Sequence, residues 1–362
     1  MFTPDPIASP VASEDAALGK SVRHPVSICD TTLRDGSHSM QHRFSQSDVR
    51  QIAAGLDASG VSIVEVTHGD GLGGSSFNYG FGLETDIDLI RCARAELKTA
   101  KLAALMIPGI GTIRNLGAAV DAGIDIIRIA THCTEADIAI QHLGEAKRRG
   151  IETVGFLMMS HMVTPSILAR QALIMREAGA DTVYVVDSAG ALLPGQVSER
   201  VEAMRDALDP QARIGMHAHN NLGVGVANAL AATESGAVVL DGSLHGLGAG
   251  AGNAATEVLC AALDRADIAT GVDTLRLIDV AEDVVGAICA GRLPTLDRGS
   301  LLLGYVGVYS SFLLHARRAA RQYRVSEADI LLELGRRRVV GGQEDQILDV
   351  ALGLADRASL PA

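Results

Sequence analysis

Three side chains that could share one reaction stand close together in TTLRDGSHSM, residues 31–40. Arg34 is a permanent cation that can stabilise an oxyanion, and Asp35 is a carboxylate that can bind a metal ion. His38 has an ordinary pKa near neutrality, so it can take up and release a proton at physiological pH. The segment therefore predicts acid–base chemistry on a substrate that develops negative charge.

A pair of histidines in the segment HAH, His217 and His219, predicts a metal site. Residues i and i+2 of a strand point to the same face of the sheet, so both imidazoles can reach one ion. With Asp35 as the carboxylate, they form a set of two histidines and one carboxylate that leaves positions open for water and substrate. These ligands suit Mn²⁺, Fe²⁺, Co²⁺ or Mg²⁺, and Zn²⁺ is a further candidate.

An open-sided ion could chelate a 2-oxo acid through its carboxylate and keto oxygens. It could then stabilise the enolate that forms when a carbon–carbon bond breaks. Arg34 would add a positive charge against the enolate oxygen, and His38 would move the proton. In the alternative interpretation, Arg34 and Asp35 form a structural salt bridge and His38 is a surface residue.

The elements that must position these residues alternate between apolar runs and amphipathic stretches. SQSDVRQIAAGLDASG, with Ser45 or Ser47 as its N-cap, and TPSILARQALIMREAGA both have helical periodicity. Continuous apolar strands separated by helices are typical of a parallel sheet covered on both faces. They predict a closed (β/α)₈ barrel, with a doubly wound open sheet as the alternative fold. The expected strands span residues 26–30, 62–69, 102–107, 126–132, 153–161, 182–188, 213–219 and 238–245.

Polar residues gather where these runs end. In a parallel barrel the active site forms at the carboxyl ends of the strands, so we expect these residues around one mouth of the barrel. Besides the residues named above, they are Asp30, Glu65, His68, His132, His161, Asp187, Asp241 and His245.

The pattern divides the chain into three parts. Residues 1–22 are expected to form a mobile tail, residues 23–265 the catalytic barrel, and residues 266–362 a mostly helical C-terminal domain. The strand-like runs stop near residue 266, and amphipathic helices follow. Their apolar faces must be covered, either by the rim of the barrel or by another protein.

Charge and composition argue against several partners. The 362 residues carry 31 Lys and Arg against 43 Asp and Glu, a net charge of −12, so neither nucleic acid nor an anionic membrane is expected to bind. No apolar run is long enough to span a bilayer and no signal peptide precedes the first strand, which predicts a cytoplasmic protein. The five cysteines form no CxxC pair, so neither disulfides nor a thiolate zinc site is expected.

Several longer motifs carry a resemblance to a known family. They are TTLRDGSH (31–38), VTHGDGLGGSSFNYGFG (66–82), ATHCTEAD (130–137), GFLMMSHM (155–162), MHAHNNLGVGVAN (216–228), GAGAGN (248–253), GYVGVYSSF (304–312) and GGQEDQ (341–346). Over nearly the whole chain after about residue 24, these motifs resemble the 4-hydroxy-2-oxovalerate aldolase family of metal-dependent barrel lyases.

The resemblance implies a class II pyruvate aldolase that splits 4-hydroxy-2-oxopentanoate into pyruvate and acetaldehyde in aromatic or steroid meta-cleavage catabolism. Its implied cofactor is Mn²⁺, with Mg²⁺ or Co²⁺ as alternatives. By motif position, Asp35, His217 and His219 would hold the metal. Arg34 would steady the pyruvate enolate, and His38 would take the proton from the C4 hydroxyl of the substrate.

The same resemblance surrounds the substrate with further residues. A tyrosine of GYVGVYSSF would close over it, with Tyr309 as the first choice and Tyr305 as the second. Leu105 and Ile107, at the end of the third expected strand, would bound the aldehyde end. Ser188, at the end of the sixth, is expected to contact the substrate.

The resemblance also implies a partner, an acylating acetaldehyde dehydrogenase that receives the volatile aldehyde directly. The helical C-terminal domain would bind it. In the alternative, this domain joins copies of the chain to one another.

Rival functions rest on parts of the same motifs. GLGAGAGN (246–253) could cradle phosphate in a nucleotide-binding oxidoreductase, but it follows the last strand, and a tight turn that brings Asn253 near the metal fits better. A Claisen-type synthase or an acyl-CoA lyase would share LRDG and HxHN. Synthases favour glutamine where His38 stands, however, and the lyase carries a cysteine in the late glycine-rich loop. A noncatalytic scaffold would lose metal ligands, and all three candidates are present.

Overall fold

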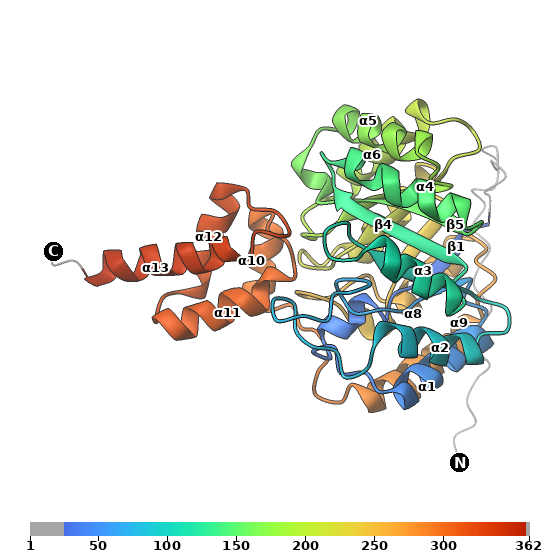
Figure 1. Cartoon of the computed structure of the whole chain (residues 1–362), viewed down its shortest axis with the longest axis horizontal. Coiled ribbons are helices and arrows are strands. Elements are labelled where there is room, and N and C mark those ends of the chain that lie inside the picture. The colour runs from blue at the N-terminus through green and yellow to red at the C-terminus, as the bar shows by residue number, and fades with distance from the viewer. Residues whose placement is uncertain (1–24, 360–362) are drawn as a thin grey trace, which may run out of the picture.

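The computed structural model describes residues 25–359 as a closed barrel with a helical domain beside it (Figure 1). The strands are all parallel, and β1 pairs with both β2 and β8, which closes the barrel and confirms the predicted (β/α)₈ fold. The expected tail at residues 1–22 lies outside the described residues. The strands are β1 Ser27–Asp30, β2 Ile63–Glu65, β3 Lys101–Met106, β4 Ile126–His132, β5 Glu152–Met158, β6 Thr182–Asp187, β7 Arg213–Ala218 and β8 Val239–Gly242.

Amphipathic helices follow the strands and cover the outside of the barrel. Helix α1 begins at a capping box, in which the Asp48 N–H donates to Ser45 Oγ and the Ser45 N–H donates to the Asp48 carboxylate. Of the two expected N-caps, Ser45 is therefore the one used. The helices of the barrel are α1 Gln46–Ala58, α2 Asp86–Glu96, α3 Ile113–Asp121, α4 Ile140–Arg148, α5 Pro165–Glu177, α6 Pro194–Ala207, α7 Gly225–Glu234 and α8 Thr256–Arg265.

The chain after α8 stays with the barrel before it enters the second unit. Helix α9 (Thr274–Asp279) and the π-helical segment η5 (Val280–Gly286) follow, and Leu277, Val285 and Cys289 belong to the hydrophobic core of the barrel. A separate core begins at Leu303. We therefore propose that the two units divide between Cys289 and Leu303, later than the residue 266 expected from the sequence.

The second core joins the four helices of the C-terminal domain. They are α10 Arg298–Val306, α11 Phe312–Tyr323, α12 Glu327–Arg337 and α13 Asp345–Ser359. In Figure 1 these helices form a group beside the end of the barrel toward which the β4 arrow points. None of the helices within residues 25–359 is both long and apolar enough to cross a membrane.

Hydrogen bonds attach this domain to the carboxyl ends of the strands. The N–H and Oγ of Ser310 donate to the carbonyl of Ser188 at 3.1 and 2.7 Å. His161 Nε2 lies 3.1 Å from the carbonyl of Gly307. The helical domain is thus fixed over the mouth of the barrel, where a parallel barrel places its active site.

His245 is one of the polar residues expected at the strand ends. Its contacts are with segments that cover the outside of the barrel, and it takes no part in the cluster at the barrel mouth described below. It has a φ of 54°, which is uncommon for a residue other than glycine. This conformation places its Nε2 2.7 Å from the carbonyl of Ala281 in η5, while its N–H donates to the Glu257 carboxylate at 3.2 Å.

Candidate active site and metal centre

Asp35, His217 and His219 come together at the carboxyl ends of β1 and β7. One ligand atom from each residue lies within 4.8 Å of the others, and all three side chains are buried. β7 ends at Ala218, but His219 stays extended because it forms a bridge with Asn253, and the two imidazole rings lie 5.1 Å apart. The structure therefore brings together the three residues that the sequence suggested as metal ligands, in positions from which they could hold an ion.

Two further side chains orient these candidate ligands. His217 Nδ1 lies 2.8 Å from Asp241 Oδ2, which leaves Nε2 of the same ring as the atom that can bind an ion. Asn253 Nδ2 donates to Asp35 Oδ2 at 2.6 Å, so the glycine-rich loop does reach the carboxylate, as the tight-turn interpretation expects. Carboxylates and amides in such positions fix the orientation of metal ligands.

The electrostatics of the cluster suit a divalent cation. Burial alone would raise the pKa of Asp35, but the charges of Arg34, His219 and His38 outweigh it and hold this pKa well below its usual range. Burial lowers the pKa of His219 to about 4, partly offset by Asp35, so the imidazole is neutral near pH 7. An ionised carboxylate and neutral imidazoles are the protonation states that metal ligation needs.

The glycine-rich loop serves this cluster through close contact. A Cβ at Gly248 would lie 2.7 Å from both Asp35 Oδ2 and Asn253 Nδ2, so a side chain at this position would collide with the ligand and its hydrogen-bond partner. This close contact explains why a glycine stands at position 248. The phosphate-binding role of the oxidoreductase alternative is not needed to explain it.

Arg34 lies beside the ligands and keeps one donor free. Its Nη1 lies 2.9 Å from Asp35 Oδ1 and its Nε lies 2.7 Å from Glu65 Oε2, and the residue is only 4% exposed. The salt bridge of the alternative interpretation is therefore present. Arg34 Nη2 is nevertheless buried without a hydrogen-bond partner among the described residues, which leaves a donor for an anionic substrate group.

His38 lies on the same cluster and is not a surface residue, because its side chain is only 9% exposed. Its Nε2 is 3.8 Å from Asp35 Oδ1, and a Cβ at Gly69 would lie 2.6 Å from the same nitrogen. The loop after β2 thus brings bare backbone against the imidazole, so the alternative interpretation is wrong for His38.

A buried charge network that the sequence reasoning missed lies behind Arg34 and His217. Arg128 on β4 is 1% exposed and pairs with Glu65 Oε2 at 2.9 Å and with Asp241 Oδ2. Its guanidinium carbon also lies 4.5 Å from the ring centre of Phe156. The available signal was a lone arginine inside the apolar run IIRIATH, where a parallel strand normally has no charge.

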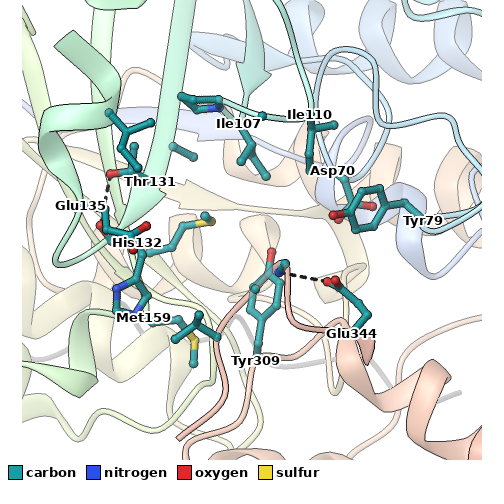
Figure 2. Close-up of a pocket in the computed structure, with 18 residues that line it drawn as sticks. Asp70, Tyr79, Ile107, Ile110, Thr131, His132, Glu135, Met159, Tyr309 and Glu344 are labelled. Carbon is teal, nitrogen blue, oxygen red and sulfur yellow. Dashed lines mark hydrogen bonds between the residues drawn. The ribbon is translucent and has the colours of Figure 1, made fainter. Parts of the chain in front are cut away.

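A cavity of about 260 Å³ opens between the mouth of the barrel and the C-terminal domain, and both Tyr309 and Ile107 line it (Figure 2). Tyr305, the second choice for the tyrosine, is 76% exposed on α10 and does not line the cavity. Leu105 does not line it either; it is 3% exposed and belongs to the apolar cluster inside the barrel. Ser188 is also buried, and its Oγ accepts a hydrogen bond from the Met159 N–H at 3.1 Å.

The cavity has mostly apolar walls with a few ionisable groups. In Figure 2, Tyr309 and Glu344 reach it from the C-terminal domain, and Asp70 and Tyr79 reach it from the loop after β2. The sequence reasoning named none of Asp70, Tyr79 and Glu344. These three residues line one cavity only because the C-terminal domain packs against the barrel. Local sequence patterns do not predict how two domains pack.

Comparison with known proteins identifies the family. Residues 25–284 match the HMGL-like family, and residues 294–356 match the DmpG-like communication domain. The 4-hydroxy-2-oxovalerate aldolase of Chloroflexus aurantiacus is 56% identical over 333 residues, which cover 92% of this chain and 96% of that protein. The enzyme of the same name from Roseiflexus castenholzii is 57% identical over 327 residues, which cover 90% of this chain and 96% of that protein.

One solved structure is similar to this chain in fold only. The carboxyl transferase domain of Rhizobium etli pyruvate carboxylase with 3-hydroxypyruvate superposes with a TM-score of 0.79 at 17% identity, over 92% of this chain and 61% of that one. The matches in sequence are much closer and run the length of both chains. The chain therefore belongs to the HMGL-like family and, within it, to the 4-hydroxy-2-oxovalerate aldolases that its motifs resemble.

Proposed function

We propose that the protein is a divalent-metal-dependent aldolase that cleaves 4-hydroxy-2-oxopentanoate into pyruvate and acetaldehyde. The observation that carries this proposal is the buried cluster of Asp35, His217 and His219 beside the unpaired Nη2 of Arg34, in a chain 56% identical to a named aldolase of this class. The proposed ion is Mn²⁺, held by those three residues, and when bound it would act as a Lewis acid on the 2-oxo acid.

The residues of the chain supply the other parts of the reaction. His38 takes the proton from the C4 hydroxyl as the C3–C4 bond breaks and acetaldehyde leaves. The electron pair of that bond passes to the pyruvate half as an enolate, and Arg34 Nη2 is the donor available to its oxygen. Return of a proton to C3 completes pyruvate, so atoms and charge balance over the cycle.

The apolar cavity fits the aldehyde half of the substrate. Ile107 and Tyr309 line it, and burial raises the pKa of the Tyr309 phenol, which therefore stays protonated and can donate a hydrogen bond. We assign these two side chains to the aldehyde end. Leu105 and Ser188 support the walls from behind, through the interior of the barrel and the Met159 backbone.

We also propose that the C-terminal domain binds an acylating aldehyde dehydrogenase, to which acetaldehyde passes directly in meta-cleavage catabolism. The match to a communication domain over residues 294–356 supports this partner. The helices α10 to α13 also expose large apolar side chains, including Leu301, Leu314, Leu332, Leu348 and Leu352. Exposed apolar surface of this kind is typical of a protein interface.

The test of the catalytic proposal is release of pyruvate from racemic 4-hydroxy-2-oxopentanoate, followed through coupled oxidation of NADH. The purified protein should release pyruvate with Mn²⁺, more slowly with Mg²⁺, and not after chelation by EDTA. Cleavage that persists after complete removal of metal would contradict the assigned role of the cluster. Absence of cleavage with every divalent ion, with the dehydrogenase present, would contradict the aldolase proposal itself.

A further inference from the structure

A second group of potential ligands lies beside the first, formed by His38, His42 and Asp70. One ligand atom from each lies within 4.8 Å of the others. We propose that these three side chains form a second, inhibitory metal site that takes Zn²⁺ or a similar transition-metal ion. The proposal that a metal ion binds here depends only on these three side chains. The proposal that the ion inhibits the enzyme rests on the proposed function, in which His38 is the base.

The two histidines of the group differ in how free their rings are. His42 Nδ1 shares a 3.0 Å hydrogen bond with Ser37 Oγ, and the ring also contacts the backbone of Tyr79, so an ion at Nε2 would replace that contact. No hydrogen bond to the ring of His38 is present within residues 25–359, and Asp35 Oδ1 is 3.8 Å from its Nε2. His68 stacks on His42 at 3.7 Å but is not a candidate ligand, because its two nitrogens contact the carbonyl of Gly80 and the N–H of Asp70.

The environment of the Asp70 carboxylate is a second observation, independent of the ligand distances, that points to a bound cation. Its side chain is only 7% exposed, and no N–H or O–H donates to either oxygen within the described part of the chain. The nearest ionisable ring atom, His68 Nδ1, lies 3.6 Å away and already accepts the Asp70 N–H. A buried carboxylate without a donor or a counter-ion costs free energy, which a bound cation would recover.

A cavity gives an ion access to these ligands from solvent. It has a volume of about 230 Å³ and is lined by His38, His42 and Asp70, together with Tyr79, His315 and Glu344. Asp35, His217 and His219 do not line it, and His38 lies between this cavity and the first cluster. Glu344 of the C-terminal domain also lines this cavity, and its Oε1 accepts the Gly342 N–H at 3.2 Å (Figure 2). This carboxylate or a water could complete a tetrahedral shell.

The ligand types determine which metal ions bind at the second site and what binding does to catalysis. Two imidazoles and one carboxylate, the same ligand types as in the first cluster, bind Zn²⁺, Ni²⁺ or Cu²⁺ more tightly than Mn²⁺ or Mg²⁺. An ion bound through a ring nitrogen of His38 occupies the lone pair that would otherwise take the substrate proton. The site would therefore stop proton transfer while the catalytic ion stays in place.

The experiment starts from the full chain saturated with Mn²⁺ and titrates it with Zn²⁺. Calorimetry counts the zinc bound, and electron paramagnetic resonance reports whether Mn²⁺ remains on the protein. With Mn²⁺ kept in large excess over zinc, we expect one additional Zn²⁺ per chain, no release of Mn²⁺, and loss of pyruvate formation in proportion to the zinc bound. His42→Gln and Asp70→Asn should each weaken this zinc binding roughly tenfold or more, while His142→Gln on α4 should not change it.

Each outcome decides the question. Release of Mn²⁺ as zinc binds would place the zinc on Asp35, His217 and His219 and overturn the proposal, as would the absence of a second bound ion. Zinc binding that survives both His42→Gln and Asp70→Asn would place the ion elsewhere and overturn it too. If the protein proves inactive as an aldolase, the stoichiometry and the resonance signal still test the site, so the two proposals fail separately.

Discussion

Arg128 Nη1 and Glu65 Oε2 form an ion pair 2.9 Å long in the interior of the barrel. Glu65 also binds Arg34, and Arg128 also binds Asp241, which in turn binds His217. One continuous chain of buried charges therefore connects the proposed enolate-binding arginine to a proposed metal ligand. The Arg128 guanidinium therefore supports the site from behind, and it lines neither of the two cavities described above.

Replacing this guanidinium should cost far more stability than replacing an exposed one. Arg128→Met removes one cation from two buried carboxylates and leaves Glu65 with Arg34 alone and Asp241 with His217 alone. We expect the free energy of unfolding to fall by about 3–5 kcal/mol in denaturant titrations. Arg213→Met is the matched control, because Arg213 pairs with Glu152 at 3.2 Å but its side chain is 37% exposed. It should cost at most about 1 kcal/mol. Equal losses in the two variants would show that the interior network is not a stabilising element.

His38→Ala should abolish cleavage while leaving the affinity for Mn²⁺ unchanged. We expect this result because His38 lies 3.8 Å from Asp35 Oδ1 and is not one of the three proposed ligands of the catalytic ion. Pyruvate release and Mn²⁺ titration on the same preparation check both halves of the prediction. A parallel loss of Mn²⁺ binding would make His38 a ligand of the catalytic ion instead of the base.

Asp35→Ala should abolish activity in a way that added Mn²⁺ does not restore. The carboxylate is the only charged oxygen ligand of the proposed set, and without it Arg34 has no carboxylate between it and the two imidazoles. The measurement is pyruvate release across Mn²⁺ concentrations well beyond those that saturate the unaltered protein. Full recovery at high Mn²⁺ would refute the ligand role of Asp35.

His161 should make the attachment of the C-terminal domain sensitive to acid. Burial lowers its pKa to about 4 while its Nε2 contacts the carbonyl of Gly307. The unfolded chain, with the ordinary pKa of about 6.5, binds the proton first as the pH falls. The contribution of this group to stability is therefore complete above about pH 6.5 and is lost as the pH falls from there toward 4.

Thermal and denaturant unfolding of the full chain test this sign. Between about pH 7.5 and about pH 5, the unaltered protein should lose roughly 2 kcal/mol more stability than His161→Gln, whose side chain does not titrate. His142→Gln provides the control for the loss of a histidine elsewhere. An identical pH dependence in all three proteins would show that His161 does not titrate differently in the folded state.

The barrel could be predicted because each strand of a parallel sheet is buried on both faces. Each strand therefore appears in the sequence as a continuous run of apolar residues. It was less exact about where strands end: β8 stops at Gly242 although the apolar-polar run continues to His245. The chain there turns into the loop that anchors η5, a contact between segments that local patterns do not encode. Likewise, His217 and His219 were found from their spacing, whereas Asp70 and Glu344 meet only because the C-terminal domain docks on the barrel.

The exposed face of α13 provides the last test, that of the proposed partner. Leu348 and Leu352 are 47% and 46% exposed and, four residues apart, lie on the same side of the helix. The variant with Leu348→Glu and Leu352→Glu should lose co-purification with an acylating aldehyde dehydrogenase. It should still release pyruvate on its own, because neither residue lines the cavity at Tyr309. Leu193→Glu, at an equally exposed leucine of the barrel, should keep the complex intact. If Leu193→Glu breaks the complex and the α13 variant does not, the partner binds the barrel and the apolar face of α13 serves another purpose.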